Sequence, residues 1–243
     1  MDSLPFSVPG EGDLAHSAVL FRAAGAARLN SLLVLAHGAG GGQSHPFMVR
    51  YARGLAERGI DVVTFDFPYI QRGRSAPDRA PVLESAFRRV ISGASARPEV
   101  AGSRLFIGGK SMGGRMATHI AAAPEAWPAD VPPLSGVVVF GYPLNPPGGP
   151  SKRSPDRVSH LARITVPMLI VQGTRDNFGG PKDIDNALSG LKPAGVKAGE
   201  SAGLKSGRNR GPEVFAVEGG DHSLAARFDQ IVWDQVVAFV SST

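Results

Sequence analysis

The chain has 243 residues, of which 42% are hydrophobic and 19% charged, as expected of a globular protein with one substantial core. No stretch reaches the ~20 apolar residues that cross a bilayer, and residues 1–9 lack the features of a secretory signal, so we expect a cytoplasmic protein without membrane contact. The lack of cysteine excludes disulfides and a thiol nucleophile. The net charge is +5, but the basic residues are scattered and only 7% of residues are aromatic, which argues against a nucleic-acid partner.

Short apolar runs alternate along the chain with segments of helical periodicity. Runs of this kind, rich in β-branched residues, are typical of strands that are buried on both faces. An antiparallel strand is expected near the N-terminus, at residues 18–22. The other expected strands are residues 31–36, 61–65, 104–108, 136–140, 166–171 and 213–217.

Apolar residues recur at helical spacing between these runs. The segments with this pattern are residues 47–55, 83–91, 115–123 and 224–236. Strands that alternate with helices predict an α/β fold, with a mostly parallel central sheet covered by helices on both faces. No repeat and no change of composition marks a boundary, so we expect residues 1–243 to form a single domain.

Two irregular stretches interrupt this alternation. Residues 142–156 are rich in proline and glycine, and the run at 146–150 cannot form a helix. Only one short helical segment follows, near residues 158–163, so we expect no large cap and a shallow, open pocket. Residues 194–212 are basic and rich in glycine and serine, which predicts a solvated loop, with contact to an anionic ligand as the alternative.

The strongest local signal is the segment Gly109-Lys-Ser-Met-Gly-Gly114, which lies between an expected strand and an expected helix. A sharp strand-to-helix turn exposes a serine nucleophile when small residues flank it two positions to either side. We therefore expect Ser111 to be a nucleophile at the carboxyl edge of the sheet. The alternative is an ordinary glycine-rich turn; the spacing of a phosphate-binding P-loop does not occur upstream.

A second glycine-rich segment, His37-Gly-Ala-Gly-Gly-Gly42, directly follows the expected strand at 31–36. Acyl transfer requires N–H donors that stabilise a developing oxyanion. The expected donors are the main-chain amides of Met112, next to the candidate nucleophile, and of Ala39, with Gly40 as the second choice. A flexible loop is the alternative interpretation of the glycine run.

Two more expected strands are followed by candidate partners of Ser111. Asp176 ends the segment Gln172-Gly-Thr-Arg-Asp176 and is suited to orient a histidine, although an aspartate after a strand is commonly a turn former. His222 lies in a glycine-rich loop and is the one histidine that follows Asp176. The order Ser, Asp, His, with each residue after a separate strand, indicates a catalytic triad in which His222 is the base.

These segments support a resemblance, together with His45-Pro-Phe-Met48, Phe65-Asp-Phe-Pro-Tyr69, Gly141-Tyr-Pro-Leu144 and Phe178-Gly179. The chain resembles the capless, dienelactone-hydrolase-like branch of the α/β-hydrolases from about residue 33 to its C-terminus. More narrowly, it resembles bacterial relatives of a domain found in a testis-expressed hydrolase-like protein and in a subunit of a histone acetyltransferase (NSL) complex. Relatives of true dienelactone hydrolases use a cysteine nucleophile, whereas Ser111 occupies that place here, so the resemblance does not carry over that activity.

Several polar side chains follow strands at the edge of the sheet where ligands bind in such folds. The candidate substrate contacts are Tyr69, Tyr142, His45 and Lys110, whereas Arg72 and Arg175 are expected to be solvated. No histidine or acidic cluster has metal-ligand spacing, and a serine triad requires no metal or other cofactor.

The sequence therefore predicts a serine hydrolase, most simply a carboxylesterase that hydrolyses small short-acyl esters through an acyl-enzyme. The same residues would serve a thioesterase, a lactonase or an amidase. A non-catalytic interaction module on the hydrolase scaffold is the alternative from another class. Neither the natural substrate nor the oligomeric state follows from the sequence.

Overall fold

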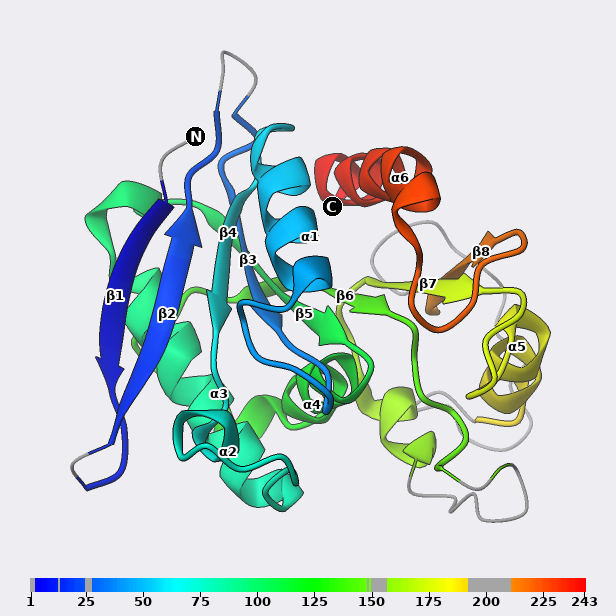
Figure 1. The fold of residues 1–243 in the computed structure, drawn as a ribbon. Coiled ribbons are helices and arrows are strands. Elements are labelled where there is room, and N and C mark those ends of the chain that lie inside the picture. Colours follow the sequence, from blue (N-terminus) through cyan, green and yellow to red (C-terminus); the bar gives the residue numbers. More distant parts are fainter. Residues whose placement is uncertain (1–2, 13, 25–27, 148, 150–156, 192–210) are drawn as a thin grey trace.

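The computed structural model describes residues 3–12, 14–24, 28–147, 149, 157–191 and 211–243. In this part of the chain, eight strands form one sheet in the order β1-β2-β4-β3-β5-β6-β7-β8 (Figure 1). The strands are β1 (Ser3–Pro9), β2 (Ala15–Phe21), β3 (Ser31–Ala36), β4 (Asp61–Phe65), β5 (Arg104–Lys110), β6 (Leu134–Phe140), β7 (Met168–Gly173) and β8 (Glu213–Val217).

Strands β3 to β8 are mutually parallel, and only β1 and β2 run antiparallel to their neighbours. Each of the expected strands is present, and most boundaries agree within two residues. β1 was not predicted: it pairs with β2 as a hairpin at the edge of the sheet, where it is largely exposed and therefore lacks an apolar run.

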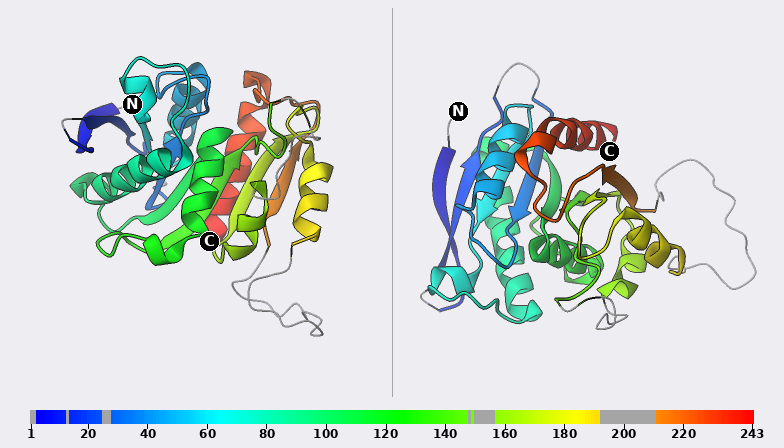
Figure 2. Two further views of the ribbon diagram at one scale, coloured as in Figure 1. Left: turned by 90° about the horizontal axis from the view of Figure 1, so that it is seen from below. Right: turned by 45° about the vertical axis from the view of Figure 1, so that its right-hand side comes forward.

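Helices cover both faces of the sheet (Figure 2). Alternate residues of β3 show the two layers, because side chains of a strand point to opposite faces in turn. Leu32 and Val34 pack with residues of α3 and α4, whereas Leu33 and Leu35 pack with residues of α1 and α6. The helices are α1 (Pro46–Ala56), α2 (Pro68–Gln71), α3 (Ala80–Ser95), α4 (Met112–Ala121), α5 (Pro181–Ser189) and α6 (Asp229–Ser242). The predicted α/β architecture, a mostly parallel sheet covered by helices on both faces, is thus confirmed.

Short 3-10 helices complete the connections: η1 (Pro98–Val100), η2 (Pro124–Ala126), η5 (Ser159–Arg163) and η6 (Ala226–Phe228). Between β6 and β7, where the sequence predicted no large lid, η5 is the only helix among the described residues. Residues 194–210 of the expected loop, and residues 148 and 150–156 of the stretch at 142–156, lie outside the described residues. No helix in the described ranges has both the length and the apolar character to cross a membrane.

Candidate active site

Ser111 stands on a sharp turn between β5 and α4. Its backbone has φ 52° and ψ −113°, a conformation that is strained for a residue with a side chain. The flanking glycines make the turn possible, because a Cβ on Gly109 would lie 2.4 Å from the Gly113 carbonyl carbon and a Cβ on Gly113 would lie 2.4 Å from the Ala36 oxygen. The turn therefore needs glycine at both positions, and it exposes the Ser111 hydroxyl above the sheet.

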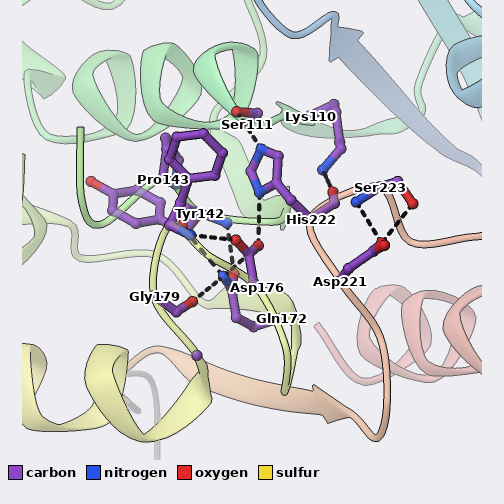
Figure 3. Close-up of polar contacts among 12 residues, drawn as sticks. Lys110, Ser111, Tyr142, Pro143, Gln172, Asp176, Gly179, Asp221, His222 and Ser223 are labelled. Carbon is purple, nitrogen blue, oxygen red and sulfur yellow. Dashed lines mark hydrogen bonds and ion pairs between the residues drawn. The ribbon is translucent and has the colours of Figure 1, made fainter. Parts of the chain in front are cut away.

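The structure brings Ser111, Asp176 and His222 together from the ends of three different parallel strands (Figure 3). His222 Nδ1 lies 2.7 Å from Asp176 Oδ2, and His222 Nε2 lies 2.9 Å from Ser111 Oγ. A carboxylate can only accept, so Nδ1 carries the proton, and Nε2 is left to accept the hydrogen of the serine hydroxyl. This tautomer is the one that a general base acting on Ser111 requires.

The Asp176 carboxylate is held by more than the histidine. The Phe178 main-chain N–H donates to Oδ1 at 2.8 Å, and Gln172 Nε2 donates to Oδ2 at 2.9 Å. Gln172 Nε2 also donates to the Gly179 carbonyl at 2.6 Å, and the glutamine is fully buried at the end of β7. These contacts fix the orientation of the carboxylate towards His222, so the imidazole is aligned by a rigid network.

Lys110 connects the nucleophile turn to the loop that carries His222. Its ammonium donates to the His222 carbonyl oxygen and lies 5.4 Å from the centre of the Phe47 ring. Burial lowers the pKa of Lys110 to about 8, against the weaker opposing fields of Asp176 and Asp221. Lys110 thus contacts the triad through the backbone and also borders the cavity beside it.

A cavity of about 310 Å³ opens beside the serine. Its walls combine two members of the triad, the glycine-rich loop after β3 and three apolar side chains. The lining residues are His37, Gly38, Ala39, Gly40, Gly41, His45, Phe47, Met48, Lys110, Ser111, Phe178 and His222. His45 lies at the cavity and also begins α1, where its Nδ1 accepts from the Phe47 N–H.

The expected oxyanion donors come from two segments, the start of α4 and the glycine-rich loop after β3. Met112 is the first residue of α4, a position whose N–H has no acceptor within its own helix. Ala39 and Gly40 are exposed and line the cavity. The candidate donors of the loop therefore share a cavity with Ser111, and the candidate donor of the helix is its neighbour in the chain.

Two expected substrate contacts do not reach this cavity. Tyr69 and Tyr142 are fully buried, and neither lines it. The Tyr69 hydroxyl lies 3.0 Å from the Ala39 carbonyl oxygen and donates to it, and the Tyr142 hydroxyl donates to the Arg157 carbonyl. Both follow strands at the correct edge, but their side chains turn into the core to bind main-chain oxygens, so the prediction that they bound the pocket was wrong.

Sequence reasoning missed several residues of the site. Phe47, Met48 and Phe178 provide the apolar walls of the cavity, and the Phe178 ring lies 4.5 Å from that of His222 between centroids. Gln172 was also missed, although a signal was available: a polar side chain that ends a buried apolar run must find hydrogen-bond partners. Within the described ranges, no group of three or more histidine and acidic side chains is arranged to hold a metal ion.

Comparison with known proteins supports the assignment of the fold. A family model described as "Alpha/beta hydrolase domain" matches residues 29–235. A lid-less α/β serine hydrolase from Xanthomonas campestris has a TM-score of 0.70 at 17% identity, over 98% of this chain and 94% of that one. A dienelactone hydrolase from Anabaena variabilis has a TM-score of 0.69 at 16% identity, over 98% and 96% of the chains.

The esterase domain of a Rhodothermus marinus protein is also similar, with a TM-score of 0.67 at 14% identity over 100% of this chain and 99% of that one. Identities this low establish the shared fold, whereas the family model covers most of the chain directly. The fold resembles those of the lid-less serine hydrolase and the dienelactone hydrolase, and the family model shows that the chain belongs to the α/β-hydrolase family.

Proposed function

We propose that this protein is a serine carboxylesterase that hydrolyses small esters with short acyl chains. The observation that carries the proposal is the chain of two hydrogen bonds that links Ser111 through His222 to Asp176, at 2.9 and 2.7 Å. The apolar cavity directly beside Ser111 supports binding of an acyl group, and the resemblance of the fold to an esterase domain and to lid-less serine hydrolases supports the reaction class.

In the proposed mechanism, the Ser111 oxygen attacks the ester carbonyl while His222 Nε2 takes the hydroxyl proton. The carbonyl oxygen becomes an oxyanion and accepts hydrogen bonds from the amides of Met112 and Ala39. The C–O bond to the alcohol then breaks, the alcohol leaves with the proton from His222, and an acyl-enzyme on Ser111 remains. Water, deprotonated by the same imidazole, releases the acid and restores the serine.

Substitution of the nucleophile tests the proposal. Ser111→Ala should lower kcat for p-nitrophenyl acetate by about 10⁴- to 10⁶-fold and leave the circular dichroism spectrum unchanged. Esters, thioesters, lactones and amides of the same acyl group should be compared in parallel, with esters expected to give the highest kcat/KM. Wild-type turnover by a folded Ser111→Ala protein would overturn the proposal. A higher kcat/KM with thioesters, lactones or amides than with esters would overturn the assignment of esters as the substrate class.

A further inference from the structure

The residues that support the glycine-rich loop after β3 lie in one short segment after β4. This segment, residues 66–69, contacts the loop and the residue after it through a carboxylate, a main-chain N–H and a phenol hydroxyl. The Asp66 carboxylate accepts from the Gln43 main-chain N–H at 2.7 Å, and the Phe67 main-chain N–H donates to His37 Nε2 at 3.1 Å. The third contact is the Tyr69 hydroxyl on the Ala39 carbonyl, at 3.0 Å.

The loop carbonyls therefore have defined partners. Because His37 Nε2 accepts from Phe67, its proton resides on Nδ1, which donates to the Gly38 carbonyl at 2.7 Å. Burial lowers the pKa of His37, which keeps the imidazole neutral and this tautomer in place. The next carbonyl, that of Ala39, accepts from Tyr69, so two successive carbonyls of the loop point towards buried side chains.

The direction of the carbonyls sets the direction of the amides. In a planar trans peptide, the C=O of one residue and the N–H of the next point in opposite directions. A Gly38 carbonyl held by His37 turns the Ala39 N–H away from the core, and an Ala39 carbonyl held by Tyr69 does the same for the Gly40 N–H. Both residues are exposed and line the cavity beside Ser111, so these amides face the side on which an oxyanion would form.

We propose that Tyr69 is a positioning residue for the oxyanion hole. Its hydroxyl fixes the Ala39–Gly40 peptide and also lies 3.4 Å from the Gly38 carbonyl, whose peptide carries the Ala39 N–H, so that both loop amides stay directed at the reacting carbonyl. Burial raises the pKa of Tyr69 to about 12, with the charges of Asp66 and Asp78 adding to the effect, so the phenol keeps its proton and acts as a donor. This role rests on the proposed esterase function, since it concerns stabilisation of the transition state of that reaction.

The chain offers a matched control for the test. Tyr142 is as buried as Tyr69, and its hydroxyl likewise donates to a main-chain carbonyl, that of Arg157, away from the cavity. Tyr69→Phe and Tyr142→Phe therefore remove the same group from comparable environments, and only the first removes a contact to the loop. Thermal unfolding of both variants gives the loss of stability that is common to the two changes.

Kinetics on p-nitrophenyl acetate and inhibition by a trifluoromethyl ketone, whose adduct with serine carries an oxyanion, provide the readouts. Tyr69→Phe should lower kcat about 10- to 100-fold with KM within about twofold, and should raise the inhibition constant of the ketone in parallel. Tyr142→Phe should change neither. Equal kinetics for Tyr69→Phe and the wild type would overturn the proposal, as would equal losses in the two variants.

Labelling of the wild type by a fluorophosphonate separates this proposal from the proposed function. A wild-type protein that neither turns over the ester nor takes up the label would overturn the esterase assignment itself. A wild type that is active and labelled, beside a Tyr69→Phe variant with unchanged kcat and unchanged ketone inhibition, would overturn only the positioning role.

Discussion

Exchange of Gln172 for glutamate places a second carboxyl group against Asp176 without a change of shape. In the wild type, the Gln172 amide nitrogen lies 2.9 Å from Asp176 Oδ2 and 2.6 Å from the Gly179 carbonyl oxygen, both of which are acceptors. In Gln172→Glu an oxygen occupies this place, and the site is fully buried. An ionised side chain there would set two carboxylates side by side, so the new carboxyl group should remain protonated to a pH well above its usual range.

The size of the effect follows from that shift. A buried carboxyl beside another carboxylate has its pKa raised by roughly three units, which corresponds to about 4 kcal/mol. The folded protein holds a proton that the unfolded chain loses above a pH of ~4.3, so stability is retained below this pH and falls as the pH rises towards the folded-state pKa. A protonated carboxyl group has a single O–H, so in Gln172→Glu either Asp176 or the Gly179 carbonyl loses its donor at every pH, which costs about 1 to 2 kcal/mol.

Thermal unfolding across pH 4.5 to 8 measures this effect. Relative to the wild type, Gln172→Glu should lose about 2 to 8 °C at the acidic end and roughly 8 to 16 °C more at pH 8, because 1 kcal/mol lowers the Tm by about 2 to 4 °C in a chain of this size. Gln230→Glu is the control, since Gln230 Nε2 also donates to a carboxylate, that of Asp234 at 2.9 Å, but in an exposed position. A Tm difference for Gln172→Glu that does not vary with pH would refute the reasoning.

Two further predictions concern the cavity beside Ser111. The pKa of Lys110 in the folded protein is lowered to about 8, so between pH 8 and ~10.4 Lys110 keeps its proton mainly in the unfolded chain. The free energy of unfolding of the wild type should therefore rise relative to that of Lys110→Met across this pH range. A difference in unfolding free energy that stays constant with pH would contradict this. The cavity of about 310 Å³ favours acetate to hexanoate esters. In a p-nitrophenyl ester panel, kcat/KM should fall beyond hexanoate, and a steady rise to palmitate would imply a long apolar tunnel.

The location of the site could be predicted from the sequence because the parallel strands are easy to recognise in it. Buried parallel strands read as continuous apolar runs, and their carboxyl ends meet at one edge of the sheet. Ser111, Asp176 and His222 each follow such a run, so their order alone indicated that they would meet, and the structure places them within hydrogen-bonding distance.

What the sequence could not provide was the direction of individual side chains. Tyr69 lies one residue into the single turn of α2, and that turn carries the ring beneath the loop after β3 rather than into the cavity. Phe47 and Met48 read as the core face of a helix, yet they also form the cavity wall because α1 begins beside the triad. Position along a strand predicts the edge of the sheet, whereas the orientation of a side chain depends on tertiary packing.

Covalent labelling of Ser111 tests the central claim most directly. A fluorophosphonate reacts with a serine hydroxyl only when an adjacent base activates it. Peptide mass spectrometry of the labelled wild type should place a single adduct on Ser111, labelling should be abolished in Ser111→Ala, and His222→Ala should slow it strongly. An unlabelled wild-type protein, or an adduct that persists in the folded Ser111→Ala variant, would contradict the account of this site.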